Sequence, residues 1–293
     1  MFSILQEYFS YAFVVRALYV GIFVALCSAL LGVSLVLKRY SMIGDGLSHV
    51  GFGTLAIAMA LNLAPLQVSI PLVLLAAFLL LRVSENSKIK GDAAIALISS
   101  SSLALGGIII AVSTGMGADV CNYMFGAILA MRISDVYLSI GAAAVVLILY
   151  LIFYNRIFTV TFDESFAKAT GTKVGYYNML IAFLTALVIV VGMRMMGAML
   201  ISGLIIFPAL TSMRILKSFK SVVITSAVLA VICFFLGMVL SLIISTPKGG
   251  NIPPGASIVA VNLGAFCLFL IIGALKKWNA GHKLRQDLKE AAK

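Results

Sequence analysis

Long apolar stretches separated by short loops dominate this sequence, and the loops hold most of its basic residues. The stretches are about 17–25 residues long, which is the length that an α-helix needs to cross the hydrocarbon core of a bilayer. Of the 293 residues, 62% are hydrophobic and 11% are charged. Soluble domains are about 45–50% apolar and about 25% charged. The chain is therefore predicted to be an all-α membrane protein, a polytopic helical bundle.

Nine candidate membrane spans are predicted, and one further segment is ambiguous. The spans cover residues 12–37, 42–61, 66–82, 92–112, 135–155, 176–193, 195–213, 221–244 and 255–276. Residues 119–131 are too short to cross and are interpreted as a re-entrant or interfacial helix, or as part of a broken span. The expected count is eight to ten crossings, with nine as the best value. Residues 1–280 then form one transmembrane domain, and the polar tail 281–293 is expected to be mobile.

The basic residues predict an orientation. If the loop at Lys38 and Arg39 is cytoplasmic, all but four of the 21 lysines and arginines fall on the cytoplasmic side. The four exceptions are Arg16, Arg132, Arg194 and Lys248. Cytoplasmic loops of membrane proteins carry such an excess of positive charge. The N-terminus is therefore predicted outside and the C-terminus in the cytoplasm. The net charge of +11 fits loops that face anionic lipid, not a nucleic-acid partner.

An acidic residue and a histidine lie one helical turn apart within the second predicted span. Asp45 and His49 project from the same face of a helix because residues i and i+4 are neighbours there. Carboxylate and imidazole are ligands of divalent transition metals, and ionisable residues inside a membrane usually mark a pathway or site. Alternatively, Asp45 caps the helix N-terminus and His49 hydrogen-bonds a neighbouring helix. Both interpretations remain open from the residues alone.

The loop after the fifth span contains a short helix-like run with acidic residues at its start. Asp163 and Glu164 precede residues 165–170, and Gly171 ends the run, which is an ordinary pattern of helix start and stop. The loop is either a solvated connection or a docking helix that receives force from a soluble partner. The sequence contains no GxxxxGK[ST] phosphate loop, no HExxH motif and no CxxC pair. The chain is therefore predicted not to be an enzyme and not to bind ATP by that route.

Three segments resemble the membrane permeases of metal-uptake ABC importers. RYSMIGDGLSHVGFGTLAIA resembles the GD and LSHA stretch of that family, with Gly46 and Val50 where alanine is usual. TFDESFAKATGTKVGYYN is similar to its loop with an aspartate, a phenylalanine–alanine pair and a glycine. LTALVIVVGMRMMGAMLISGLIIFPALTSMRI resembles its most regular region. STPKGGNIPPGASIV looks like the stretch that precedes the last helix in the zinc branch.

The resemblance implies more than the residue pattern does. It implies a homodimer in the bacterial cytoplasmic membrane with the metal path at the subunit interface, cytoplasmic ATPase subunits, and an extracytoplasmic metal-binding protein. Metal-path roles carry over to Asp45 and His49. Contact with the ATPase carries over to segment 163–171, with Asp163, Glu164, Phe166, Ala167 and Gly171 as the matching residues. No tightly bound cofactor is implied, because the metal ion is the transported substrate.

The expected function is thus transport of a divalent metal into the cytoplasm, with Zn²⁺ as the favoured ion and Mn²⁺ or Fe²⁺ as the alternative within the family. An alternative of another class is a stand-alone channel or proton-coupled carrier, in which Asp45 and His49 relay protons. A membrane scaffold without a path is a third alternative, but it leaves the pair of ionisable residues without a role.

Overall fold

The computed structural model describes residues 10–63, 65–86, 91–113, 133–244 and 252–291, and within these ranges it contains helices and no strand. The prediction of an all-α chain is confirmed. The helices in chain order are α2 (Ala12–Leu37), α3 (Ile43–Ala60), α4 (Pro65–Asn86), α5 (Gly91–Val112), α7 (Ile133–Ile152), α8 (Tyr154–Phe162), α9 (Glu164–Ala169), α10 (Val174–Met196), α11 (Ala198–Met213), α12 (Phe219–Ile243) and α13 (Pro254–Ala291).

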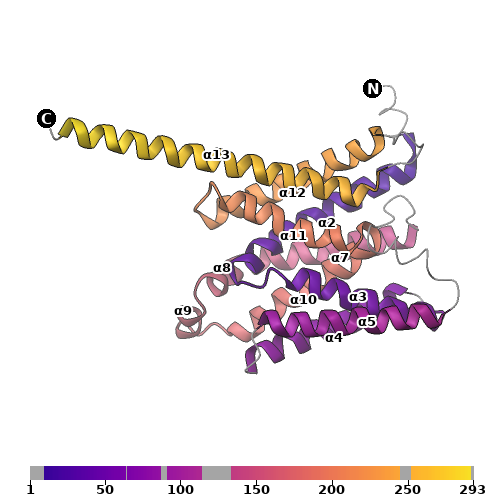
Figure 1. The fold of residues 1–293 in the computed structure, drawn as a ribbon. Coiled ribbons are helices and arrows are strands. Elements are labelled where there is room, and N and C mark those ends of the chain that lie inside the picture. Colours follow the sequence, from indigo (N-terminus) through magenta and orange to yellow (C-terminus); the bar gives the residue numbers. More distant parts are fainter. Residues whose placement is uncertain (1–9, 64, 87–90, 114–132, 245–251, 292–293) are drawn as a thin grey trace.

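The long helices form two groups that α10 joins (Figure 1). Helices α3, α4 and α5 pack together on one side of the molecule, and α2, α11, α12 and α13 pack together on the other. Helix α10 contacts α3 and α4 in the first group and α2 and α11 in the second. One continuous cluster of buried apolar residues runs through both groups. The groups are therefore parts of a single packed bundle.

Each of the nine predicted spans coincides with a helix, but fewer of these helices meet the requirements for crossing a membrane. By length and composition, six helices among the described residues could cross: α2, α5, α7, α10, α12 and the first part of α13. The apolar part of α4 (Leu66–Leu80) and α11 are shorter, and α3 contains the polar pair. The count of nine crossings and the orientation remain predictions. Residues 119–131 lie outside the described residues.

The outer surface of the bundle is apolar. Large hydrophobic side chains are exposed along α5, α7 and α13, including Leu105, Ile108, Ile148, Leu268 and Ile271. Soluble monomers rarely expose contiguous apolar surface on this scale. A surface of this kind is suited to contact with lipid chains.

Small residues allow the helices to approach closely. A Cβ atom built on Gly32 of α2 would lie 2.0 Å from the carbonyl oxygen of Ile205 in α11. No side chain fits there, so glycine is what lets the two backbones meet. In lipid, close backbone approach of this type replaces the hydrophobic effect as the source of helix association.

Two predicted segments differ from the helices in extent. The span predicted at 135–155 corresponds to Ile133–Ile152, and a separate helix, α8, begins at Tyr154. The apolar part of the last helix ends at Lys276, as predicted, but the helix itself continues to Ala291, so the tail 281–293 is helical up to that residue. Apolarity stops near Lys276, but the following lysine, leucine, glutamine and alanine residues are good helix formers.

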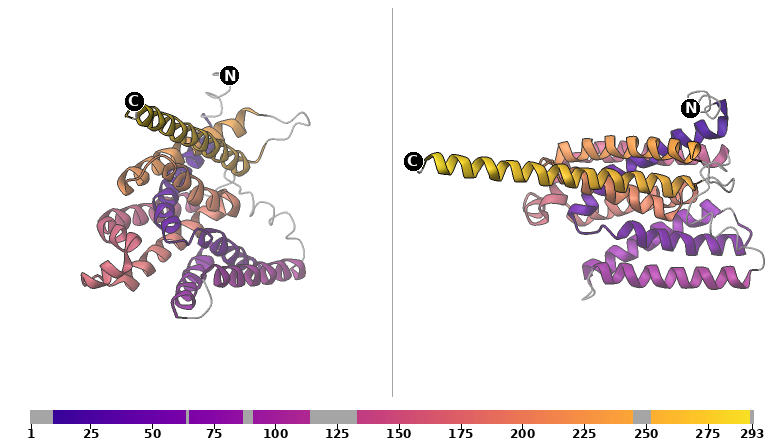
Figure 2. Two further views of the ribbon diagram at one scale, coloured as in Figure 1. Left: turned by 60° about the vertical axis from the view of Figure 1, so that its left-hand side comes forward. Right: turned by 45° about the horizontal axis from the view of Figure 1, so that its top comes forward.

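The two ends of the described chain lie at opposite ends of the bundle. Helix α2 begins at one end, whereas the C-terminal part of α13 projects beyond the other helices at the opposite end (Figures 1 and 2). The short helices α8 and α9 lie at the same end as this projecting part of α13. We call it the α9 end of the bundle.

Candidate metal pair and docking segment

Asp45 and His49 lie side by side in the first two turns of α3, as their spacing predicts. The Nε2 atom of His49 is 3.5 Å from the Oδ2 atom of Asp45. The side chain of Asp45 is 46% exposed and that of His49 is 24% exposed, although most of α3 around them is buried. The pair therefore forms a polar strip on the outside of a single subunit.

The packing of α3 against α5 fixes the direction in which this strip faces. A Cβ atom on Gly53 would lie 2.8 Å from the carbonyl oxygen of Ser102, and a Cβ atom on Gly46 would lie 2.5 Å from Cγ2 of Ile95. The two glycines thus let α3 lie close against α5, and because His49 is three residues after Gly46 and four before Gly53, this contact lies beside the pair. An alanine at position 46 would add a methyl group that presses on Ile95.

The capping interpretation of Asp45 is not what the structure shows. The N-cap residue of α3 is Met42, which makes no side-chain capping bond, and Asp45 is the third residue of the helix. A carboxylate in the first turn still interacts favourably with the helix dipole. Among the described residues, the polar group next to the His49 ring is the Asp45 carboxylate of the same helix.

The pair can chelate a cation but cannot surround one. Two ligands of a tetrahedral zinc ion, at about 2.0–2.1 Å from the metal, lie about 3.4 Å apart, which is close to the observed 3.5 Å. Among the described residues, no group of three or more His, Cys, Asp and Glu side chains could hold a metal. The described part of one subunit therefore offers two side chains at a chelating distance.

The predicted docking segment folds as a short helix with a capped start and a glycine stop. Asp163 is the N-cap of α9, and its Oδ1 atom accepts a hydrogen bond from the backbone N–H of Phe166 at 2.9 Å. Gly171 follows the helix with a φ of 77°, a conformation that glycine adopts without strain. The run begins at Glu164 and ends at Ala169, within one residue of the prediction.

The structure divides the five predicted docking residues between anchoring and exposed positions. Ala167 is fully buried and packs with Val160 of α8 and Val174 of α10. Phe166 points away from this cluster, and 59% of it is exposed. Asp163 and Gly171 shape the ends of α9. Phe166 is therefore the large apolar side chain of α9 that is exposed.

Glu164 is tied to the body of the bundle by two residues that the sequence did not single out. Lys38, just after α2, donates to Oε1 of Glu164 at 2.5 Å and to Oδ1 of Asn178 at 2.6 Å. The Nδ2 atom of Asn178 donates to the same carboxylate at 3.2 Å. Burial raises the pKa of Glu164, but the hydrogen bonds and positive charge of Lys38, together with Asn178 and Lys168, outweigh it and lower the pKa below its ordinary value.

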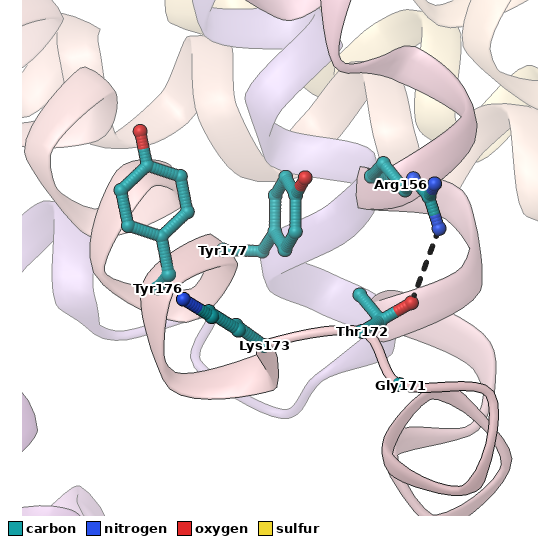
Figure 3. Close-up of a pocket in the computed structure, with 6 residues that line it drawn as sticks. All are labelled: Arg156, Gly171, Thr172, Lys173, Tyr176 and Tyr177. Carbon is teal, nitrogen blue, oxygen red and sulfur yellow. Dashed lines mark hydrogen bonds between the residues drawn. The ribbon is translucent and has the colours of Figure 1, made fainter.

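An open cavity of about 370 Å³ lies beside α9. Arg156 and Lys173 bring positive charge to its wall, and the rings of Tyr176 and Tyr177 complete it (Figure 3). The Nη1 atom of Arg156 donates to Oγ1 of Thr172 at 3.2 Å. The α9 end of the bundle therefore carries the exposed Phe166 and, beside it, a cavity lined by basic residues.

Residues 10–273 match the description of one family, the ABC 3 transport family. The chain belongs to this family. The resemblance inferred from the three sequence segments is confirmed, and the ABC 3 match extends from before α2 into α13.

Relatives of this ABC 3 chain include permeases named for different metals. The manganese import system permease protein ScaB of Streptococcus gordonii is 30% identical over 274 residues, which cover 94% of this chain and 96% of the relative. The zinc uptake membrane protein ZnuB of Haemophilus influenzae is 28% identical, over 80% of this chain and 90% of the relative. In the solved structure of PsaBC from Streptococcus pneumoniae in complex with Fab, one chain superposes with a TM-score of 0.79 at 31% identity, covering 91% of this chain and 94% of that chain.

These similarities and the apolar helices identify the chain as a multi-pass protein of the bacterial plasma membrane and a metal-uptake permease of the ABC 3 family. The family is one of transport permeases. The names of the relatives include both manganese and zinc, so the family does not decide which metal this chain carries.

Proposed function

We propose that the chain is the membrane subunit of an ATP-driven importer that moves Zn²⁺ or Mn²⁺ into the cytoplasm. The observation that carries this proposal is the half-exposed pair of Asp45 and His49 on α3. Within a family of metal-uptake permeases, a carboxylate and an imidazole at chelating distance are suited to hold a divalent cation in passage. The ion is the substrate and not a resident cofactor.

The exposure of the pair also supports a homodimer. Ionisable side chains on the outside of a membrane bundle are costly against hydrocarbon and are normally turned toward protein or water. A second copy placed over this face of α3 would cover the pair and bring a second Asp45 and a second His49 to the same path. Four side-chain ligands across a two-fold axis would complete what one subunit leaves open.

The arrangement of the chain ends supports the predicted topology. A chain whose first helix begins at one end of the bundle and whose last helix ends at the other crosses an odd number of times. Nine crossings satisfy this condition, with the N-terminus outside and the C-terminus in the cytoplasm. The α9 end then faces the cytoplasm, which also gives the basic loops the orientation expected from membrane insertion.

The partners follow from this orientation. A cytoplasmic ATPase subunit would bind at α9, with Phe166 as the apolar contact. An extracytoplasmic binding protein would deliver the metal at the opposite end of the bundle. Energy for transport would come from the ATPase, since this sequence contains no phosphate loop of its own.

Passage requires that the metal be held only briefly. Ionised Asp45 offers one oxygen and neutral His49 offers one nitrogen, and water or the second copy supplies the remaining ligands. The pair of one copy with water as the remaining ligands binds the ion more weakly than the four side chains of two copies together. This suits a path in which the ion must leave as well as enter.

Reconstitution of the permease with its ATPase and binding protein tests the proposal. Liposomes loaded with ATP on the ATPase side should take up metal from the binding protein, and omission of the ATPase should abolish uptake. The Asp45→Ala/His49→Ala double variant should lose uptake while it keeps the ATPase bound. Uptake that persists without the ATPase would instead indicate a channel or a carrier driven by an ion gradient.

A competition experiment in the same liposomes separates zinc from manganese. Each metal is supplied on the binding protein in turn, and the uptake is compared at equal occupancy of that protein. The donor set of one imidazole and one carboxylate is compatible with both ions. Equal uptake would assign the choice of metal to the binding protein, whereas a strong preference would assign it to the permease.

A further inference from the structure

Lys38, Glu164 and Asn178 form a polar junction that joins three parts of the chain far apart in the sequence. We call these three residues the α9 junction. Lys38 donates to both partners at 2.5 and 2.6 Å, and Asn178 closes the triangle with a 3.2 Å bond to Glu164. The junction connects the end of α2, the start of α9 and the first turns of α10.

Lys38 is held in this junction by burial as well as by charge. Only 6% of its side chain is exposed, whereas Lys168 on α9 and Lys173 before α10 are exposed. Lysine is almost never buried this deeply unless it is paired. Removal of one partner leaves the other charge poorly solvated. The ion pair with Glu164 therefore fixes the distance between α9 and the end of α2.

The same residue also borders the start of α3. Lys38, Tyr40, Ile43 and Asn178 line one small cavity of about 10 Å³, which leaves little free space between them. Ile43 is the first residue of α3, is 1% exposed and belongs to the main core cluster. Lys38 and the first residue of the helix that carries Asp45 and His49 therefore line the same small cavity.

The loop between Lys38 and α3 is short and hydrogen-bonded. The backbone N–H of Tyr40 donates to the Leu35 carbonyl at 2.9 Å, and the N–H of Ile43 donates to the Tyr40 carbonyl at 3.0 Å. Arg39 between them has a φ of 63°, a left-handed conformation that closes the turn tightly. A connection of this kind transmits displacement and does not absorb it.

We propose that Lys38 is a positioning residue that couples α9 to the Asp45–His49 pair, so that movement of α9 shifts the start of α3. The inference rests on the proposed function of α9 as the ATPase contact. Lys38 itself touches neither the metal nor the ATPase. It acts through Glu164 on one side and through Ile43 and the loop before α3 on the other.

A variant series in the reconstituted importer tests the coupling. Lys38→Met removes the charge and keeps a side chain of similar length, Lys38→Arg keeps the charge, and Lys217→Met removes an exposed lysine elsewhere. In the Lys38→Met complex the ATPase should still co-purify, but the metal ions transported per ATP should fall by about tenfold, within the range by which residues on a coupling network change it. Lys38→Arg should retain at least about half of the coupling, and Lys217→Met should resemble the wild type.

Three outcomes of this series would overturn the proposal. The first is a Lys38→Met importer with an unchanged ratio of metal to ATP. The second is a Lys38→Met permease that no longer binds the ATPase, since Lys38 would then be part of the docking contact. The third is a Lys38→Arg variant as defective as Lys38→Met, which would exclude the ion pair as the link. Glu164→Gln breaks the pair from its exposed side and should reproduce the Lys38→Met result if Lys38→Met does not fold.

A second measurement tests the α9 junction without requiring the permease to bind the ATPase. Hydrogen–deuterium exchange of the permease alone should become faster in Lys38→Met, by about threefold or more, both in residues 164–170 and in residues 43–47, since both segments lose one anchor. Faster exchange in 164–170 alone would contradict a link to α3. Phe166→Asp should leave this exchange pattern unchanged. If that variant still binds the ATPase, the docking assignment fails while the exchange test of the junction stands.

Discussion

The two polar sites of this bundle are built in opposite ways. Asp45 and His49 lie on one helix, are partly exposed, and are each other's partners at 3.5 Å within the described part of the chain. Lys38, Glu164 and Asn178 come from three parts of the chain, and each bonds to both of the others. The first site has unused ligand capacity, whereas the second has its charges satisfied within the subunit.

This difference separates a site for a substrate from a structural connection. A group that must bind and release an ion has to leave room for that ion and for further ligands. A group that must hold two segments together performs best when its hydrogen bonds are complete. Changes at the metal pair should therefore affect transport far more than stability, and changes near α9 should affect assembly, coupling or local stability.

The largest expected effect is at the metal pair. Asp45→Asn keeps the shape of the side chain but removes its charge, and His49→Gln removes the imidazole. Either variant should lower the initial rate of metal uptake by more than about 100-fold, because even the loss of an outer-shell partner of a metal ligand costs about 10–100-fold. The melting temperature of the purified permease should stay close to that of the wild type. His282→Gln, which changes the other histidine of the sequence, serves as the control and should transport normally.

The next largest expected effect is a difference between substitutions at two adjacent residues of α9. Phe166→Asp should weaken binding of the ATPase by about 30-fold, the scale of a central interface residue, and leave the folded permease as stable as before. Ala167→Asp places a charge in the buried cluster with Val160 and Val174 and should destabilise α8, α9 and α10 themselves. Binding of the ATPase measured by surface plasmon resonance, combined with thermal unfolding, distinguishes the two. Equal destabilisation by both variants would contradict the division of α9 into an exposed and an anchoring side.

A smaller effect is expected where α3 meets α5. In Gly53→Ala the new methyl group would lie 2.8 Å from the Ser102 carbonyl oxygen, and a backbone atom cannot move aside cheaply. This overpacking should cost about 1–3 kcal/mol. Gly107→Ala in α5 has no atom within 4 Å of its new Cβ and should be neutral or stabilising by up to about 1 kcal/mol. Thermal unfolding of both variants in the same detergent makes the comparison, and Gly53→Ala should also reduce uptake because it moves α3.

The smallest effect is a pH dependence of the α9 junction. The pKa of Glu164 lies below its ordinary value of 4.5 in the folded chain. The stabilisation from this lowered pKa is fully present above pH 4.5 and is lost as the pH falls through the folded value. Exchange protection of residues 164–170 in the wild type should therefore approach that of Lys38→Met as the pH falls below the lowered pKa of Glu164. A difference between the two proteins that persists unchanged in strong acid would show that the ion pair does not hold α9.

Local features of the fold and site could be predicted from the sequence, and long-range ones could not. Hydropathy located each long helix, and the spacing of Asp45 and His49 placed them on one face because a helix brings residues i and i+4 together. Acidic residues and Gly171 marked the ends of α9 for a similar local reason. The pairing of Lys38 with Glu164 spans 126 positions, and Lys38 is one of 21 basic residues in the sequence, so nothing local distinguishes it.

The packing of the helices also determines features that the hydrophobic periodicity of the sequence does not predict. Phe166 and Ala167 were expected to act together, yet the six-residue helix α9 is too short for an apolar pattern to show which side faces the bundle. The continuation of α13 beyond Lys276 was missed because apolarity marks the part of a helix that lies in lipid, and not where the helix ends. The sequence thus predicts individual helices well and their mutual contacts poorly.

Electron paramagnetic resonance of Mn²⁺ tests the central claim most directly. Mn²⁺ added to the assembled permease and ATPase should show nitrogen modulation from a directly coordinated imidazole. This signal should disappear in His49→Gln and persist in His282→Gln. Nitrogen modulation that survives in His49→Gln would contradict the claim that the metal passes between Asp45 and His49.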